Sequence, residues 1–131
     1  MIPYGDRRFS LKTFLLLAVL CNGIIAYNAK AQNTSAVYVV IHIDLDSTRT
    51  REGLALLRAY VQQCRTDPAN QSEQLLQEPH RRNHLTLIEG WRNEAEFAAH
   101  LRQGYVLNFR KSIQPILGSP FDERLHQAVG P

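Results

Sequence analysis

The sequence predicts an α+β domain of the ferredoxin-like kind, in which a split β-α-β-β-α-β order builds a four-stranded antiparallel sheet with helices on one face. Three observations predict it: apolar residues at period two in several short stretches, apolar residues at helical spacing between them, and turn residues at the junctions. A sheet covered on one face leaves the other face open, and a second copy of the same sheet would cover it. The sequence therefore predicts a homodimer together with the fold.

The first 31 residues are typical of a secretory leader. Arg7, Arg8 and Lys12 form a basic region, residues 13–27 are mostly apolar, and residues 29–31 have the small-x-small pattern of a cleavage site. The apolar stretch is shorter than the roughly 20 residues that span a bilayer, which favours cleavage over a retained anchor. We therefore expect cleavage near Ala31, no stable membrane insertion afterwards, and a periplasmic or secreted domain of residues 32–131.

The basic character of the chain belongs to this leader. Of the 15 lysines and arginines, 4 precede residue 32, and of the 12 acidic residues 1 does, which leaves 11 of each in the remaining domain. A balanced domain lacks the cationic face that nucleic-acid binding needs, so we expect no nucleic-acid partner. Cys64 is the one cysteine after the leader, which excludes an internal disulfide in the mature chain, and its apolar setting indicates a buried, inert thiol.

The first strand and the first helix are predicted by adjacent stretches of different period. Residues 36–46 have an apolar residue at every second position, which indicates a strand with one buried face. Residues 47–65 start with hydroxyl side chains that can cap a helix and continue with an apolar stripe at helical spacing. The stripe consists of Leu54, Leu57, Val61 and Cys64. Asp67 and Pro68 then supply turn chemistry that ends the helix.

The middle of the domain is predicted to be a hairpin followed by a short helix. Residues 71–78 and 83–91 read as two strands joined by a solvated turn, the second strand more clearly than the first. Asn93 is a favourable N-cap, and Glu96 three positions later completes a capping-box pattern. A helix is therefore expected from Asn93 to about residue 102.

The end of the domain is predicted to be a second helical stretch and a last strand. Residues 105–117 carry apolar residues at helical spacing, and Pro115 is expected to distort the last turn. Residues 122–129 alternate again and predict the fourth strand. By alternation, the uncovered face of the sheet would carry Val40, Thr86, Ile88 and Ala128.

Three histidines, His42, His84 and His126, fall on that uncovered face as well, on strands that are neighbours in the ferredoxin-like order. Three imidazoles near Asp44 could form a zinc or copper site. No short-range ligand motif accompanies them, and hydrogen-bonding or solvated histidines are the favoured interpretation. The sequence therefore predicts no metal site.

The candidate catalytic residues come from the junction between the third strand and the helix after it. Strand alternation puts Glu89 and Trp91 on the helix-covered face, and the helix turns His100 toward the same face. A carboxylate beside an imidazole can orient its tautomer and shift its pKa, as a proton shuttle for a phenol requires. The structural alternative is that Glu89 pairs with a cation or caps amides, Trp91 fills the core, and His100 is a hydrogen-bonded core-edge residue.

Tyr105 and Phe109 lie one helical turn apart and could form an aromatic wall at the mouth of a pocket. The Tyr105 hydroxyl could bind an oxygen of the ligand. The alternative for both is ordinary packing.

These stretches resemble a known family. Residues 85–101, LTLIEGWRNEAEFAAHL, followed by residues 107–129 are similar to the antibiotic biosynthesis monooxygenase (ABM) domain, in which a strand ending in Glu-x-Trp leads through a short acidic helix to Ala-His-Leu. The resemblance extends from Val37 to Val129 and is most specific from Glu89 to His100. It implies a dimeric α+β barrel with a ligand pocket between the sheet and the helices of each subunit.

The resemblance also implies that no cofactor is needed. The oxygenases that resemble this chain use neither metal nor flavin, because an electron-rich substrate, once deprotonated, passes an electron to dioxygen itself. Two positions depart from the relatives: Tyr105 stands where many have a histidine, and Arg110 stands where the haem-degrading branch has its axial histidine. Haem degradation is therefore disfavoured.

Two functions of different classes follow. The first is an exported, homodimeric, cofactor-independent oxygenase that acts on a small aromatic, quinol-like compound. In it His100, assisted by Glu89, would accept or relay the hydroxyl proton, Trp91 and Phe109 would hold the ring, and Tyr105 would orient an oxygen. The second is a non-catalytic dimeric module that binds a small hydrophobic ligand or only pairs with itself.

Overall fold

The structure, a computed structural model, describes residues 35–130. The predicted leader and its cleavage site lie outside the described residues. The elements are β1 (Val37–Asp44), α1 (Thr50–Cys64), β2 (Asn70–Gln77), β3 (His84–Trp91), α2 (Glu94–His100), α3 (Gly104–Ile113), the 3-10 helix η1 (Gln114–Ile116) and β4 (Asp122–Gln127). The predicted β-α-β-β-α-β order is confirmed, with the second helical region divided into α2 and α3.

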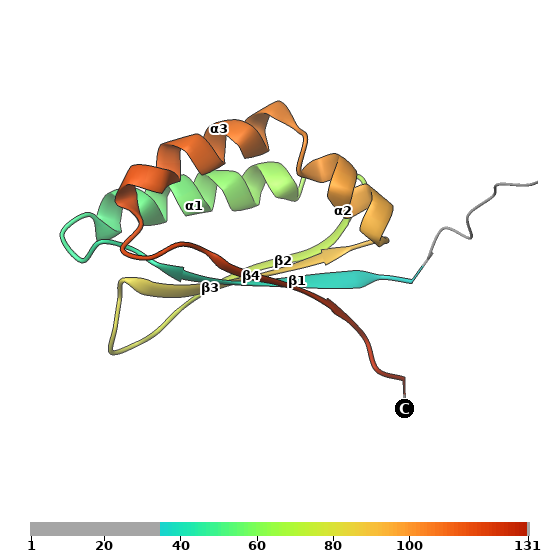
Figure 1. The fold of residues 1–131 in the computed structure, drawn as a ribbon, viewed down its shortest axis with the longest axis horizontal. Coiled ribbons are helices and arrows are strands. Elements are labelled where there is room, and N and C mark those ends of the chain that lie inside the picture. The colour runs from blue at the N-terminus through green and yellow to red at the C-terminus, as the bar shows by residue number, and fades with distance from the viewer. Residues whose placement is uncertain (1–34, 131) are drawn as a thin grey trace, which may run out of the picture. The chain divides into compact units, whose positions relative to one another are not determined.

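The strands form one antiparallel sheet in the order β2-β3-β1-β4. All three α-helices lie on one side of this sheet, with α1 and α3 next to each other and α2 at one end (Figure 1). This is the predicted ferredoxin-like arrangement. Among residues 35–130, no helix is both long and apolar enough to cross a membrane.

The central strand β1 shows why the sheet has one buried face. Val37, Val39, Ile41 and Ile43 point toward the helices and are buried, whereas Tyr38 on the opposite face is 39% exposed. Burial at every second position is the pattern that an apolar period of two produces in a strand covered on one side.

Helix α1 packs on the sheet through the predicted stripe, in which Leu57, Val61 and Cys64 are fully or almost fully buried. The predicted hydroxyl cap is wrong. The N-cap residue is Arg49, whose guanidinium has no acceptor and makes no capping hydrogen bond. In the preceding turn the carboxylate of Asp46 accepts hydrogen bonds from both the amide and the hydroxyl of Thr48.

Helix α2 starts as predicted. The side chain of Asn93 accepts a hydrogen bond from the amide of Glu96 at 2.9 Å. The Glu96 carboxylate lies 3.5 Å from the guanidinium of Arg92. Asn93 thereby fixes where the helix begins. The position of that start determines which later residues of α2 face the sheet.

The chain after α3 also follows the prediction, apart from its last residues. Pro115 lies at the start of η1, where the helix changes from α to 3-10 geometry. The amide of Gly118 then binds the carbonyl of Asp44 at 2.8 Å, which returns the chain to the sheet. Strand β4 ends at Gln127, so Ala128 lies beyond the sheet rather than on its uncovered face.

Candidate functional site

The three residues predicted to converge do so beneath the helices. Glu89 and His100 are each 1% exposed, and Trp91 is fully buried. The indole of Trp91 donates a hydrogen bond from Nε1 to Oε2 of Glu89 at 3.0 Å. Its ring lies against the imidazole of His100, with 4.1 Å between ring centroids.

Tyr60, on α1, joins Glu89 to His100. Its hydroxyl donates to Oε1 of Glu89 at 3.0 Å and lies 2.9 Å from Nε2 of His100. The other imidazole nitrogen, Nδ1, lies 3.0 Å from the hydroxyl of Tyr105 on α3. The imidazole is therefore held between two phenols, and the carboxylate reaches it through one of them.

Burial dominates the acid-base properties of this cluster. Loss of hydration lowers the pKa of His100 to about 4; to a smaller extent the charge of Asp67 raises this pKa and that of Arg110 lowers it further. Burial also raises the pKa of Glu89, against the hydrogen bonds from Trp91 and Tyr60. The site thus favours a neutral imidazole and makes the carboxylate a stronger base than an exposed glutamate.

A groove between α1 and α3 reaches the edge of the cluster. Its volume is about 210 Å³, and its walls include Leu56, Tyr60, Tyr105, Asn108 and Phe109. The ring of Phe109 stacks on that of Tyr60 with 4.1 Å between centroids. Tyr105 and Phe109 line this groove, whereas Trp91 is buried and does not. All residues that line it belong to α1 and α3, so it lies between two helices and not, as the resemblance implied, between the sheet and the helices.

The substrate-binding roles of Trp91, Tyr105 and Phe109 stay predictions. In this conformation Trp91 contacts the rings of Phe97 and His100 and the carboxylate of Glu89. In this position Trp91 holds the side chains that it contacts in place.

Sequence reasoning missed two residues of the cluster, Tyr60 and Glu73. Tyr60 is 4% exposed and lies beside Val61, at the edge of the predicted stripe. Glu73 is 6% exposed, lies opposite Glu89 on β2, and has a buried Oε1 without a hydrogen-bond partner in the structure. Pairing the two predicted strands outward from their turn would place Glu73 opposite Ile88, whereas the observed register places it opposite Glu89.

Glu73 adds a second buried carboxyl group next to the site. Its Oε2 accepts a hydrogen bond from the side chain of Asn70 at 2.9 Å. Burial, and then the negative charge of Glu89, raises the pKa of Glu73 to about 8. At neutral pH the Glu73 carboxyl group is therefore mostly protonated.

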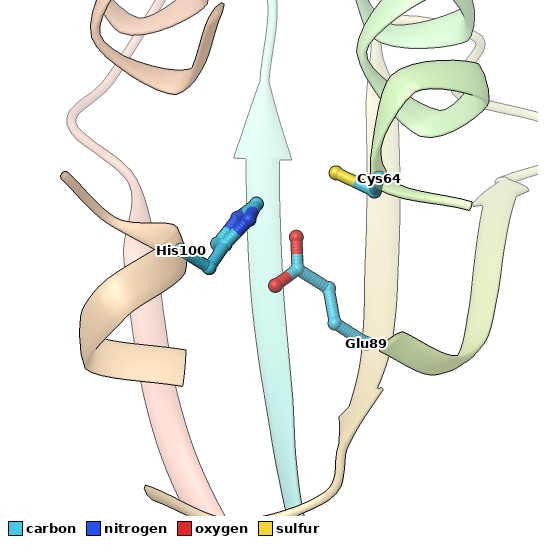
Figure 2. A group of neighbouring side chains, drawn as sticks. All are labelled: Cys64, Glu89 and His100. Carbon is cyan, nitrogen blue, oxygen red and sulfur yellow. The ribbon is translucent and has the colours of Figure 1, made fainter. Parts of the chain in front are cut away.

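Cys64, Glu89 and His100 have the donor types of a metal site. One donor atom from each lies within 4.8 Å of the others, and the side chains point toward one another from α1, β3 and α2 (Figure 2). The hydroxyl of Tyr60, however, already binds both Glu89 and His100. An ion held by these two residues would have to displace it, so the geometry fits a hydrogen-bonded network better than a metal centre. Burial raises the pKa of the Cys64 thiol, in agreement with the predicted inert cysteine.

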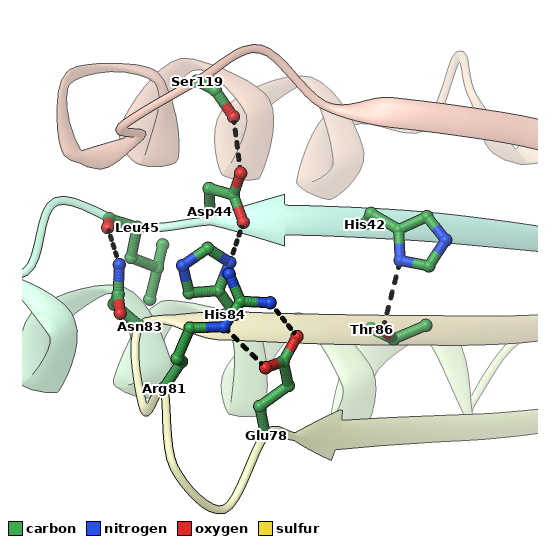
Figure 3. A network of polar contacts seen from close by, with 9 residues as sticks. All are labelled: His42, Asp44, Leu45, Glu78, Arg81, Asn83, His84, Thr86 and Ser119. Carbon is green, nitrogen blue, oxygen red and sulfur yellow. Dashed lines mark hydrogen bonds and ion pairs between the residues drawn. The ribbon is translucent and has the colours of Figure 1, made fainter.

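His42, His84 and His126 do not converge. Each has a different partner: His84 pairs with Asp44, His42 lies 3.3 Å from the hydroxyl of Thr86 (Figure 3), and His126 lies 3.0 Å from the carbonyl of Arg124. The register places them opposite different positions of β1, with His126 facing residue 38 and His84 facing residue 44. The interpretation as hydrogen-bonding surface histidines fits these contacts.

Comparison with known proteins agrees with this fold. The sequence model of the family "Antibiotic biosynthesis monooxygenase" matches residues 36–112. No curated protein matches the chain. Among solved structures, the chain is similar to Rv0793 from Mycobacterium tuberculosis, with 22% identity and a TM-score of 0.67 over 74% of this chain and 98% of that chain.

A second similar structure is SnoaB from Streptomyces nogalater, a cofactor-independent oxygenase solved as a point mutant. It is 16% identical, with a TM-score of 0.67 over 74% of this chain and 96% of that chain. PA3566 from Pseudomonas aeruginosa is 19% identical, with a TM-score of 0.68 over 73% and 96% of the two chains. At these identities the structural likeness concerns the fold. Because the family model matches more than half of the chain, the protein belongs to the antibiotic biosynthesis monooxygenase family.

Proposed function

We propose that the protein is a monooxygenase that needs no cofactor and acts on a small aromatic, quinol-like compound. One observation carries the proposal: the imidazole of His100 is hydrogen-bonded to Tyr105, which lines the groove, and through Tyr60 to the buried carboxylate of Glu89. Such a chain can remove a proton from a hydroxyl group placed in the groove. Family membership and the likeness to an oxygenase without a cofactor support the same chemistry.

In this mechanism the substrate ring lies against Phe109, and its hydroxyl group contacts Tyr105. Removal of the hydroxyl proton through Tyr105 and His100 makes the ring electron-rich enough to pass an electron to dioxygen. A hydroquinone and dioxygen then yield a hydroxyquinone and water. One oxygen atom enters the ring, the other leaves as water, and the substrate supplies the electrons, so no external reductant is required.

The proposal includes a homodimer that buries the open face of the sheet. This face carries Tyr38 and Leu76, which are 39% and 49% exposed, and the half-buried Val40 and Ile88. Apolar side chains at the centre of an uncovered sheet favour a protein partner. Light scattering on the wild type and on Val40→Glu tests it: a dimer that becomes a monomer is expected, and a monomeric wild type would contradict it.

The proposal also includes export with cleavage near Ala31, which is supported by the basic, apolar and small-residue order of residues 7–31. Intact-mass measurement of the exported protein should give a chain that starts near Gln32. A product that retains residues 1–31 would contradict this part alone.

The test of the activity is oxygen consumption with a panel of hydroquinones. Wild type is expected to turn over at least one of them, and His100→Ala is expected to lower turnover by about 100-fold, a typical size for the loss of a positioned acid-base group. Trp91→Phe should lower it as well, because it removes the hydrogen bond to Glu89. The matched control is His80→Ala, in the exposed turn between β2 and β3.

Two outcomes would contradict the proposal in different ways. No turnover of any hydroquinone by a folded wild type would reject this substrate class. Equal turnover by wild type, His100→Ala and Trp91→Phe would reject the site and leave the family membership intact.

The alternative is a module that binds a small hydrophobic ligand without reacting with it. The burial of Glu89 and His100 favours it, because only their phenol partners line the groove. Mass spectrometry of a co-purified ligand, together with an absence of oxygen consumption, would identify this function.

A further inference from the structure

We propose that Glu89, and not His100, stores the substrate proton, and that Tyr60 is the positioning residue that passes the proton between them. The inference rests on the proposed function for its catalytic use, whereas the proton relay itself is a property of the resting protein. Its basis is one unbroken chain of hydrogen bonds. The chain runs from Glu89 to Tyr60 (3.0 Å), from Tyr60 to His100 (2.9 Å) and from His100 to Tyr105 (3.0 Å).

With Glu89 ionised, one arrangement of protons satisfies the whole chain. A carboxylate only accepts hydrogen bonds, so Trp91 and the hydroxyl of Tyr60 both donate to Glu89. The oxygen of Tyr60 is then free to accept from Nε2–H of His100. Nδ1 carries no proton in that tautomer and accepts from the hydroxyl of Tyr105. The resting imidazole is therefore the Nε2–H tautomer.

Uptake of a proton reverses every hydrogen bond of the chain. The donor in the groove gives a proton to the oxygen of Tyr105, and Tyr105 gives its own proton to Nδ1 of His100. Nε2 gives its proton to Tyr60, and Tyr60 gives its proton to Glu89. Each bond that breaks is matched by one that forms, and one negative charge moves from Glu89 to the donor oxygen. No imidazolium remains in either state.

The surroundings favour this distribution of charge. Burial lowers the pKa of His100 to about 4, which disfavours the imidazolium, and burial raises the pKa of Glu89, which favours its protonated form. The other titratable or charged groups that act on the chain come from α1, the loop after it, β2, α3 and β4. They are Cys64, Asp67, Glu73, Arg110 and Glu123.

Arg110 disfavours protonation of both His100 and Glu89, and Glu123 opposes Arg110 at Glu89. These two side chains form an ion pair with each other, so their effects on the relay partly cancel. Asp67 favours the imidazolium, but burial outweighs it. After proton uptake, the carboxyl group of Glu89 is therefore favoured over the imidazole of His100 as the site of the proton.

The protein contains its own fluorescent reporter of the protonation of Glu89. Trp91 is the only tryptophan, and its indole donates to Glu89. Protonation of Glu89 weakens that hydrogen bond and should change the fluorescence of the protein. The experiment is a stopped-flow pH jump on the full chain, without aromatic substrate, that follows Trp91 fluorescence. It needs no turnover, so a failure of the relay is distinguishable from a failure of the oxygenase assay.

Tyr60→Phe and Tyr105→Phe each interrupt the chain and keep the ring. Both are expected to slow the fluorescence relaxation by about tenfold or more, within the range of effects seen when a positioned proton carrier is lost. Leu107→Ala, at an exposed position of α3 that does not line the groove, is the control and should relax like the wild type. Glu89→Gln cannot take up the proton, so it should abolish the fluorescence change.

Retained tertiary structure is checked by near-ultraviolet circular dichroism. Relaxation of both folded variants at the wild-type rate would overturn the relay. A wild type without a fluorescence change, or a Glu89→Gln variant that keeps the wild-type change, would overturn it as well. If Tyr60→Phe fails to fold, Tyr105→Phe, at a half-buried position, decides the test alone. In the oxygenase assay, Tyr60→Phe should lower kcat and leave KM unchanged, because Tyr60 acts on the proton rather than on the ring.

Discussion

Glu73 and Glu89 lie directly opposite each other on β2 and β3, and both side chains are buried on the helix-covered face of the sheet. Two like charges in this arrangement repel each other. The charge of Glu89 contributes to the raised pKa of Glu73, about 8, although burial contributes more. If Glu73 were ionised, its Oε1, which has no hydrogen-bond partner, would carry a buried negative charge that no donor stabilises.

The pH dependence of folding stability should reveal this carboxyl group. Since the pKa of Glu73 is about 8 in the folded protein and near 4.5 in an unfolded chain, the folded protein retains a proton that the unfolded chain has lost. The free energy of unfolding therefore falls as the pH rises from about 4.5 to about 8. Between pH 6.5 and 8 the loss from Glu73 should be about 2 kcal/mol. Urea unfolding at several pH values measures it.

Glu73→Gln should remove this part of the loss, because the amide cannot ionise and can still accept from Asn70. Glu94→Gln, at an exposed position of α2, is the matched control and should keep the wild-type slope. Below pH 6.5 His100 acts in the opposite direction: its pKa of about 4 makes stability rise with pH from about 4 to 6.5. An identical slope for wild type and Glu73→Gln above pH 6.5 would show that Glu73 is ionised throughout.

Gly53→Ala should destabilise the protein although alanine favours helices. A Cβ atom at Gly53 would lie 2.7 Å from both terminal methyl groups of Leu45 and 3.1 Å from Ile116. Overpacking of this kind costs about 1–3 kcal/mol, which exceeds the roughly 1 kcal/mol that alanine gains over glycine in a helix. Thermal and urea unfolding measure the net loss. In a Leu45→Val background the added methyl group should cost less, and equal cost in both backgrounds would contradict the packing argument.

Asn93→Ala should lower the free energy of unfolding by about 1 kcal/mol, because the amide of Glu96 loses its side-chain acceptor. Asn93→Ser retains an acceptor and should restore most of that loss. Since α2 carries His100, the alanine variant should also show a less ordered imidazole by NMR. Wild-type stability in Asn93→Ala would mean that the cap does not hold the start of α2.

Phe109→Ala should raise KM for an aromatic substrate by about tenfold, because stacking on an aromatic ring contributes about 0.5–1.5 kcal/mol beyond the area that it buries. Phe109 lines the groove beside Tyr60. Leu107→Ala is the matched control, since Leu107 is 56% exposed and does not line the groove. Steady-state oxygen consumption gives both constants. An unchanged KM in Phe109→Ala would place the substrate elsewhere.

Local sequence patterns determined the elements of this fold and the convergence of Glu89, Trp91 and His100. The period of two between residues 36 and 46 and the Asn93 cap are local signals, because alternation and capping depend on neighbours in the chain. The predicted hydroxyl cap of α1 is wrong because the N-cap position falls on Arg49, whose guanidinium has no acceptor. The choice of N-cap residue is also local, but residue types alone do not decide it.

The sequence by itself determined the β-α-β-β-α-β order, the buried faces of β1 and β3 and the family, since all of these depend on spacing along the chain. Only the tertiary structure decided that Tyr60 stands between Glu89 and His100, and that Glu73 lies opposite Glu89. Those contacts join residues from α1, β2, β3 and α2. Their geometry depends on strand register and on the rotation of each helix over the sheet, which are set by how the whole core packs.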